Sequence, residues 1–244
     1  MVPPSAVLKL GSPTRRLDPG DELSIAPVDG LDYAAGDLDV VALRYEITID
    51  TGATDLVGYP LDAPLTLTFD TMREITQQLP AVAELSGSAL NTGLTMPSIV
   101  VGDQQIGTIK SDLRALVTFD LTPVPSDAVF DTIRFAAAQS DVTGNPFDLG
   151  PLHLESVFYD GLDPWTYGAE PHGGHQLTAS DGEVPVWSAD ARSTVEDDLM
   201  NREVRNNLCQ YRIRFETANN DDGDFDKLGF APSSIALELT YLAE

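Results

Sequence analysis

The sequence is poor in cysteine, histidine and lysine, and it has no long hydrophobic run. Cys209 is the only cysteine among the 244 residues, so no disulfide bond can form within the chain. Because Cys209 lies in a strand-like pattern, we expect a buried, unreactive thiol. No apolar run approaches the ~18 residues that a membrane-spanning helix needs. The first residues carry no basic segment of the kind that begins a secretory signal, so we expect no signal peptide.

Familiar catalytic motifs are missing as well. The sequence holds no G-x-S-x-G string, no phosphate-binding P-loop and no H-E-x-x-H string. His172 and His175 flank a Gly-Gly pair, and a flexible loop of this kind is a poor start for a zinc site. With 39 acidic residues, some carboxylates must lie about 5–9 Å apart, so such a pair would not single out a glycosidase. We predict that the protein is not an enzyme, and a hydrolase on a β-sandwich scaffold stays only as a third hypothesis.

What the sequence has in excess is negative charge. It contains 27 Asp and 12 Glu against 3 Lys and 11 Arg, which gives a net charge of −25. Such self-repulsion opposes folding, but at 1 M salt the Debye length falls to about 3 Å and the repulsion is largely screened. The scarcity of lysine beside abundant aspartate therefore indicates a protein from a halophile; the alternative is an acidic surface protein of a mesophile. Either origin argues against nucleic acid as a direct partner.

Alternating apolar and polar residues predict antiparallel β-strands along most of the chain. The clearest run covers residues 39–49, where every second residue from Val41 to Ile49 is apolar, so one face is expected to be buried and one wet. Shorter runs of the same kind lie at 65–69, 114–121, 129–135, 150–159, 208–216 and 235–241.

The strands at 114–121 and 129–135 are the centre of this pattern. Pro123 and Pro125 interrupt the ladder between them, because proline has no N–H to donate and fixes its own φ. We interpret the pair as a hairpin-like corner of a β-sandwich. Only Leu116 falls on the wrong face of its strand.

Two segments change to a helical period. Residues 70–79 carry apolar side chains at i, i+3 and i+7 before a proline, which predicts a short helix. Residues 190–207 predict a second helix, in which Ser193-Thr-Val-Glu196 matches a capping box.

From residue 97 onward, several strings follow one another in an order found in one family. They are Val101–Asp103, Arg114–Leu121 with its proline turn, Asp131–Phe135, Leu149–Val157, Val204–Leu208, Gln210–Phe215, Asn219–Asp226 and Leu237–Tyr241. In this order they resemble the DNRLRE domains, jelly-roll modules that are similar in build to carbohydrate-binding modules. The resemblance implies an all-β fold, an antiparallel jelly-roll β-sandwich with one short helix packed at its end, and it implies no catalytic residue.

The resemblance leaves the first part of the chain unaccounted for. We therefore predict two parts: a β-rich N-terminal lobe for assembly or anchoring, residues 1–96, and the jelly-roll domain, residues 97–244. The boundary is placed in the small, polar, Gly- and Ser-containing stretch before residue 97.

Two aromatic residues, Trp165 and Tyr167, lie in the predicted loop 161–174 and are candidates for ligand binding. Flat aromatic rings on a loop stack against sugar faces or anchor a protein interface. The alternative is that they plug the end of the sandwich core.

A second candidate is an acidic turn near the end of the chain, where four carboxylates surround Gly223: Asp221, Asp222, Asp224 and Asp226. Hard oxygen ligands at this density suit a structural Ca²⁺ ion. The spacing is not that of an EF-hand, because aligning Gly223 with the loop glycine puts Ala218 at the first ligand position. The alternative is a solvated acidic turn without metal, and no other cofactor is expected.

These observations lead to one functional hypothesis and its alternative. The first is a non-enzymatic structural protein of a virus that infects a halophilic archaeon: a capsid decoration, turret or tail component of the virion. It follows from the missing secretion signal, the salt-adapted charge and the resemblance, since such modules occur in viral tail and capsid accessory proteins. The expected partners are other copies of the chain, other virion proteins and host-surface glycans, without nucleic acid or membrane insertion. The alternative is a carbohydrate-binding module of an extracellular or cell-surface protein.

Overall fold

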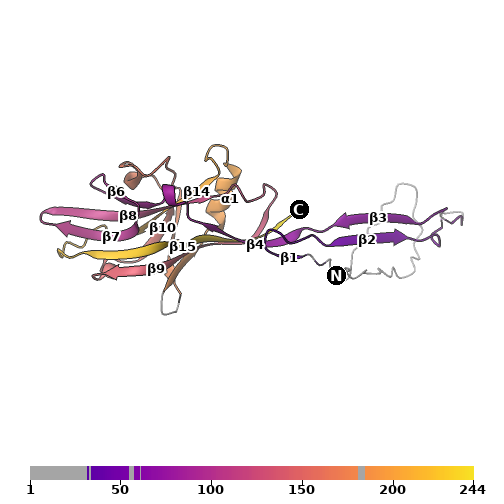
Figure 1. The fold of residues 1–244 in the computed structure, drawn as a ribbon, viewed down its shortest axis with the longest axis horizontal. Coiled ribbons are helices and arrows are strands. Elements are labelled where there is room, and N and C mark those ends of the chain that lie inside the picture. The colour runs from indigo at the N-terminus through magenta and orange to yellow at the C-terminus, as the bar shows by residue number, and fades with distance from the viewer. Residues whose placement is uncertain (1–31, 33, 55–57, 61, 181–184) are drawn as a thin grey trace. The chain divides into compact units, whose positions relative to one another are not determined.

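The computed structural model describes residues 32, 34–54, 58–60, 62–180 and 185–244, which fall into two compact units. The large unit runs from Thr76 to Tyr241, and the small unit comprises the residues up to Ile75 together with 242–244. Figure 1 labels the elements of both units. No helix in the described part of the chain is long and apolar enough to cross a membrane.

The large unit consists almost entirely of strands. Their bounds are β4 (Arg73–Pro80), β5 (Gly87–Leu90), β6 (Thr95–Met96), β7 (Ile99–Ile106), β8 (Ile109–Asp120), β9 (Val129–Thr143), β10 (Leu152–Ser156), β11 (Gly173–Gln176), β12 (Thr178–Ala179), β13 (Val186–Asp190), β14 (Leu208–Phe215) and β15 (Asp226–Ala243). Residues 73–75 of β4 and 242–243 of β15 are counted with the small unit. The remaining elements are the short 3₁₀ turns η1 (Ala83–Leu85), η2 (Pro146–Leu149) and η3 (Thr166–Gly168), and the helix α1 (Arg192–Met200).

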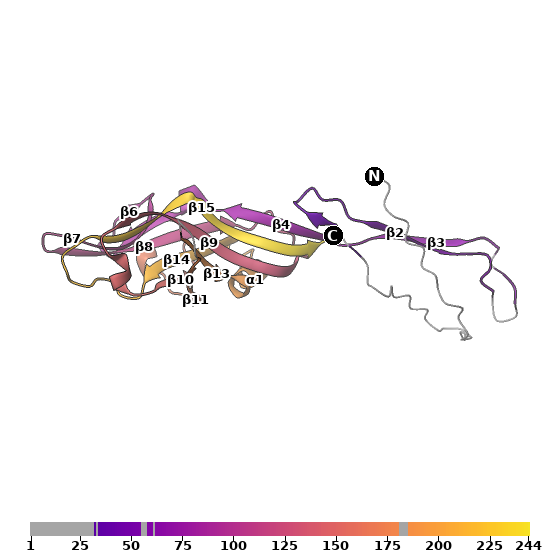
Figure 2. The ribbon, with the colours of Figure 1, turned by 90° about the horizontal axis from the view of Figure 1, so that it is seen from below.

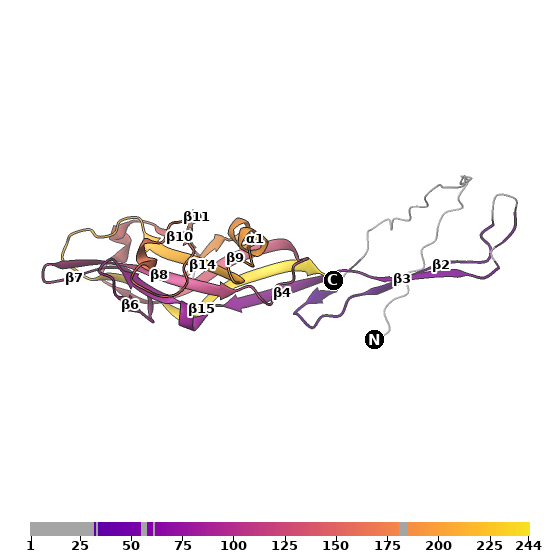
Figure 3. The same cartoon turned by 90° about the horizontal axis from the view of Figure 1, so that it is seen from above.

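These strands form one mostly antiparallel sheet, which is nearly closed and barrel-like. Its order is β11-β10-β14-β8-β7-β15-β9-β13-β12, with β4 on β15 and with β5 pairing with both β6 and β8. A single segment nearly joins the two ends of this order: β11 pairs with β10, and one residue later β12 pairs with β13. Figures 2 and 3 show the strands from below and from above, with α1 beside β9. The prediction of a mostly antiparallel β-protein with one short helix is confirmed.

Aromatic rings from three strands meet inside the sheet. Phe119 on β8, Phe135 on β9 and Tyr211 on β14 are all buried, and their ring centroids lie 5.8–6.2 Å apart in edge-on or tilted contacts. Cys209 is buried on β14 as predicted, and burial raises the pKa of its thiol to about 12. At neutral pH the thiol therefore stays protonated and unreactive.

The predicted hairpin of 114–121 and 129–135 is wrong, although both strands exist. Strand β8 pairs with β5, β7 and β14, whereas β9 pairs with β13 and β15. The contact of Phe119 with Phe135 shows that the two strands face each other through the core instead of sharing a ladder. The turn between them carries the chain across the interior, because consecutive strands need not be hydrogen-bonded neighbours.

The predicted helix at 70–79 is also wrong, since β4 occupies residues 73–80. Ile75, Gln77 and Leu79 share one face of the strand, and Ile75 and Leu79 are buried. Gln77 hides the two-residue period because it is polar, but its Oε1 accepts a 3.0 Å hydrogen bond from the hydroxyl of Tyr241. A half-buried polar group that is hydrogen-bonded in this way is tolerated beside apolar neighbours on a strand.

The predicted helix at 190–207 is confirmed in part. Helix α1 ends at Met200, and the capping box is wrong: the N-cap is Ala191, which makes no side-chain cap. Instead, Asp190 Oδ1 accepts the amide of Arg192 at 2.9 Å. Residues 201–207 form turns, in which Asn206 has a φ of 54° and Asn207 a φ of 58°, a region that asparagine tolerates better than most residues.

The small unit contains β1 (Ala35–Gly36) and a separate two-stranded sheet of β2 (Arg44–Ile49) and β3 (Leu65–Asp70). The predicted strands at 39–49 and 65–69 are confirmed for these bounds. The expected burial of one face is not found within this unit, as all six residues of β3 are exposed. Of the predicted N-terminal lobe, residues 1–31 lie outside the described residues, while β5 and β6 pair within the large unit.

Candidate functional site

A loop that covers the outer face of the sheet presents the first candidate site. Val157 and Tyr159 pack with Ala89 of β5 and Leu116 of β8, and Leu162, Tyr167 and Ala169 pack against this cluster. Leu116 is fully buried here. The alternation of residues 114–121 placed Leu116 on the face of β8 expected to be wet. Segment 157–169 covers that face, which explains why Leu116 is buried. We call residues 161–169 the Trp165 loop.

Buried hydrogen bonds fix the start of this segment. The side-chain amide of Gln210 donates to the carbonyl of Tyr159 at 3.0 Å, and its oxygen accepts the amide of Tyr159 at 3.0 Å. The Tyr159 hydroxyl lies 2.7 Å from Thr118 Oγ1. Burial raises the pKa of Tyr159, so the phenol is neutral and serves as a structural hydrogen-bonding group.

Tyr167 belongs to the support of the loop. Its hydroxyl donates to Asp112 Oδ2, and the guanidinium of Arg114 lies 4.0 Å from the ring centroid. Burial and the Asp112 carboxylate raise the pKa of Tyr167 to about 12. Burial also raises the pKa of Asp112, against the opposing effects of Tyr167 and Arg114. The hydroxyl of Tyr167 is hydrogen-bonded and one face of its ring lies against Arg114, so the side chain is held by the protein itself. Its role in ligand binding stays a prediction.

A buried ion pair anchors the backbone of the loop. Arg212 on β14 donates to the carbonyls of Tyr167 at 3.0 Å and Ala169 at 2.8 Å. The same guanidinium pairs with Glu155 on β10 at 2.6 Å, and Arg214 pairs with the other oxygen of Glu155 at 2.8 Å. Burial alone raises the pKa of Glu155, but the hydrogen bonds and charges of the two arginines together hold it below its ordinary value. Glu155 is therefore ionised at neutral pH and holds Arg212 in place.

The tip of the loop is locally rigid and exposes Trp165. Asp163 Oδ1 accepts the amides of Trp165 at 2.7 Å and Thr166 at 3.0 Å. The hydroxyl of buried Thr166 donates to the carbonyl of Gly161 at 2.8 Å. The Trp165 side chain nevertheless remains 85% exposed. A flat, largely apolar ring held in water by a braced loop is a typical contact group for a sugar or a protein.

A neighbouring turn adds apolar surface beside this tip. Gly93 has a φ of 84°, and a Cβ added to it would lie 3.6 Å from Pro164 Cβ. The turn between β5 and β6 therefore lies close to Pro164 of the Trp165 loop. Leu94 in this turn is 63% exposed. Leu94 and Trp165 thus lie on neighbouring turns, and both are exposed.

The aromatic tip is predictable from the sequence, but its support is not. Asp112, Arg114, Glu155, Arg212 and Arg214 lie on β8, β10 and β14, at positions whose alternation predicted a wet face. Two signals were available: the off-pattern Leu116, and three of the chain's 11 arginines gathered on two strands.

Of the four aspartates of the predicted calcium turn, Asp222 and Asp226 are brought together by the side-chain amide of Asn220, which donates to them at 2.8 and 3.2 Å. Asp221, with a φ of 65°, pairs with Lys110, and Asp224 is exposed. Asp222 accepts the amide of Asp224 at 2.8 Å, and Asp226 is buried, where it accepts the amide of Asn145 at 2.5 Å. Among the described residues, no group of three or more acidic, histidine or cysteine side chains is placed to hold a metal ion. The turn's predicted Ca²⁺ site stays a prediction.

A second buried carboxylate lies beside Asp226. Asp103 on β7 is opposite Asp226 on β15 in the ladder, and both are buried. One oxygen of Asp103 accepts the amide of Asn220 at 3.3 Å, while its Oδ1 is buried without a partner. Burial raises the pKa of Asp103, and the charges of Asp226 and Asp222 raise it further.

We expect Asp103→Asn to stabilise the large unit at pH 7. The raised pKa means that the native state binds a proton at Asp103 more tightly than the unfolded chain does. Wild-type stability therefore falls as pH rises from about 4, the unfolded value, through the native pKa. The amide variant lacks this loss, so its melting temperature is expected to exceed that of the wild type at pH 7 and to converge on it below about pH 4. Thermal melts at several pH values, with exposed Asp224→Asn as control, measure this; equal gains for both variants contradict it.

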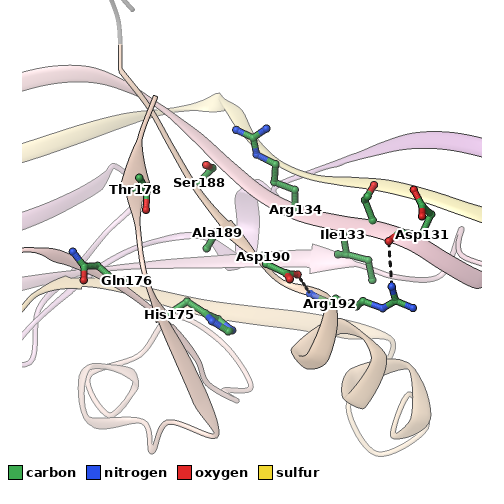
Figure 4. Close-up of a pocket in the computed structure, with 11 residues that line it drawn as sticks. Asp131, Ile133, Arg134, His175, Gln176, Thr178, Ser188, Ala189, Asp190 and Arg192 are labelled. Atoms are coloured by element: carbon green, nitrogen blue, oxygen red, sulfur yellow. Dashed lines mark hydrogen bonds between the residues drawn. The ribbon is translucent and has the colours of Figure 1, made fainter. Parts of the chain in front are cut away.

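A polar groove lies where the sheet nearly closes. It has a volume of about 610 Å³ and is lined by residues of β9, β11, β12, β13 and the start of α1 (Figure 4). Arg192 donates from its side chain to the carbonyl of Asp131 at 3.1 Å and from its amide to Asp190 at 2.9 Å, which ties α1 to the groove wall. His175 of β11 also lines the groove. The groove is open and polar, and its shape alone indicates no particular ligand.

No protein-family model matches the sequence, and no curated protein matches it. The resemblance to DNRLRE domains therefore stays a prediction, and the function has to be argued from the residues described above.

Proposed function

We propose that this protein is a non-enzymatic structural protein of a virion from a halophilic archaeal virus, and that it contacts glycans on the host surface through Trp165. The observation that carries the proposed contact is the 85% exposure of Trp165 on a loop held by the buried Glu155–Arg212 pair. A braced loop needs little ordering on binding, so most of the contact energy of the ring is retained as affinity.

The chemistry of the tip favours a neutral, flat partner. Oδ1 of Asp163 is occupied by backbone amides, and exposed Pro164 and Leu94 add apolar surface. An indole ring stacks well on the apolar face of a sugar, while the net charge of −25 repels anionic surfaces at moderate salt. We accordingly propose neutral sugars of a surface glycan as the contact. We also propose that the nearly closed antiparallel sheet is a jelly roll.

Replacing Trp165 with alanine is expected to weaken binding strongly without loss of stability. Exposed positions change the free energy of unfolding by no more than about 0.5 kcal/mol. A central aromatic anchor contributes about 2 kcal/mol or more, so binding is expected to weaken at least ~30-fold. Binding to isolated envelopes of the producing cells and to a panel of neutral glycans, measured in 3 M KCl, tests this.

The second tryptophan, Trp187, allows a fluorescence test of the same contact. It is half-buried and stacked on Phe147 with ring centroids 5.7 Å apart, and the chain has only two tryptophans. Trp187→Phe leaves Trp165 as the sole tryptophan fluorophore, whose emission should shift to shorter wavelength when a sugar covers the ring. Binding by Trp165→Ala at wild-type strength would show that the contact lies elsewhere.

The second candidate is a carbohydrate-binding module of a cell-surface protein, which rests on the same exposed ring. Buoyant-density banding of native material separates the two. Co-banding with DNA-containing particles at fixed stoichiometry supports the virion component, and recovery with cell envelopes supports the module.

A further inference from the structure

The β2–β3 sheet has one face made of aliphatic and aromatic side chains, on which the only polar group is the Tyr45 hydroxyl, bonded to the carbonyl of Asp32 at 3.2 Å. We call these two strands the ribbon. Cross-strand pairs place Tyr45 opposite Phe69, Ile47 opposite Leu67 and Ile49 opposite Leu65, and the Tyr45 and Phe69 rings stack with centroids 5.8 Å apart. The other face carries residues such as Thr48, Thr66 and the paired Arg44 and Asp70.

This apolar face is not covered by the described residues. Leu65, Leu67 and Phe69 are 50%, 52% and 38% exposed, and Tyr45, Ile47 and Ile49 are only half-buried. Among the described residues of the small unit, only Ile75 of β4 and Ala243 of β15 are buried, and neither belongs to the ribbon. A two-stranded sheet without a core is marginally stable in water. The ribbon therefore needs a cover whenever the protein is folded.

We propose that this cover is the same face of a second copy of the chain. A surface that must be covered as soon as it folds needs a partner that is always present, and another copy meets that condition. Charge limits where such a contact can form. Two chains of net charge −25 repel over most of their surfaces, but the apolar face of the ribbon carries no charged residue. Packed face to face about a two-fold axis, the two ribbons bury matching side chains in an isologous contact.

The size of the face sets the expected strength. The six side chains expose a patch on the order of 400 Å², the size at which an apolar patch marks an interaction site. A standard interface buries ~800 Å² on each partner, so the face forms the centre of a modest interface. Leu38 and Val41, 49% and 80% exposed just before β2, add apolar surface in the same unit. We expect association in the micromolar range, strengthening as salt screens the carboxylates.

Leu67→Asp tests the proposal, with Thr66→Asp as the matched control. Both variants add one carboxylate to β3, the first on the apolar face and the second on the polar face, opposite Thr48. Sedimentation velocity in 3 M KCl, at concentrations from 1 to 100 µM (on the order of the expected affinity), is expected to give a dimer for the wild type and for Thr66→Asp. For Leu67→Asp it is expected to give half that mass. Near-ultraviolet circular dichroism shows whether the large unit stays folded in each variant.

A cysteine at the same position distinguishes a second copy from another cover. Because Cys209 is buried, Leu67→Cys introduces the one accessible thiol among the described residues. In a face-to-face dimer, mild oxidation is expected to link two chains through this thiol, while Thr66→Cys is not linked. A wild type that remains monomeric at every concentration overturns the proposal. In such a monomer, a Leu67→Cys thiol that does not react with maleimide would show that another part of the same chain, such as residues 1–31, covers the ribbon. The proposal is also overturned if Leu67→Asp dimerises as strongly as the wild type. The proposal is independent of the Trp165 contact.

Discussion

Replacing Glu155 with alanine is expected to lower the free energy of unfolding of the large unit by about 3–5 kcal/mol. Its side chain is 12% exposed, and it neutralises Arg212, which is 5% exposed, as well as Arg214. Removing the carboxylate leaves a buried guanidinium with no counter-charge, and the cost of that desolvated charge exceeds the value of the pair itself. Urea unfolding in 3 M KCl, followed by circular dichroism, measures the loss.

Glu196→Ala is the matched control, because it also removes a glutamate from an arginine pair. Its partner Arg192 lies one turn away on α1, and the two side chains are 41% and 45% exposed. Surface pairs of this type contribute ~0.3–0.5 kcal/mol. Equal losses for the two variants would show that the Glu155 site is hydrated in solution.

The same substitution is expected to loosen the Trp165 loop. Without Glu155, Arg212 is no longer held against the carbonyls of Tyr167 and Ala169. Hydrogen exchange of the amides in residues 161–169 is expected to rise more than exchange in the core strands.

Glu155→Gln removes the charge of the side chain but keeps its shape. Since the native pKa of Glu155 is lowered, its stabilisation is present above about pH 4.3 and is lost as pH falls. The gap between the wild type and Glu155→Gln should close at acid pH.

Lowering the salt concentration is expected to have the second large effect, unfolding of the protein below about 1 M salt. The net charge is −25, and the arginines of the large unit are largely occupied by internal pairs such as Arg205 with Asp197 and Asp198. The Debye length grows from about 3 Å at 1 M to about 10 Å at 0.1 M, so repulsion among surface carboxylates then extends between neighbours. The ribbon contact is expected to dissociate first, because it joins two chains of the same charge.

Titration from 3 M to 0.1 M KCl, followed by far-ultraviolet circular dichroism and tryptophan emission, measures this loss. Sucrose at matched osmolality is the control, because it favours the compact state by exclusion from the surface without screening charge. Rescue by KCl but not by sucrose supports the electrostatic cause. A cooperative thermal transition unchanged in 0.1 M KCl contradicts both the expected salt dependence and the halophilic origin.

Some of the candidate site could be predicted from the sequence. The loop with Trp165 could be predicted because aromatic residues between turn-forming residues are a local signal in the sequence. Tyr167 carries the same local signal, yet its hydroxyl and ring are held by Asp112 and Arg114 on β8. That support depends on segment 157–169 crossing the outer face of the sheet, which no local pattern encodes. The same covering loop explains Leu116.

The sequence by itself determined the β-strand content, the position of α1 to within a turn at its start, the burial of Cys209 and the large negative charge. These properties follow from local alternation and from composition, which are complete in the sequence. Only the tertiary structure decided that β8 and β9 face each other through the core, that Gln77 shares a strand face with buried Ile75 and Leu79, and that Asp103 lies opposite Asp226. The physical reason is that a two-residue period specifies which face of a strand is apolar but not which strand lies beside it. That choice is made by contacts between residues far apart in the chain.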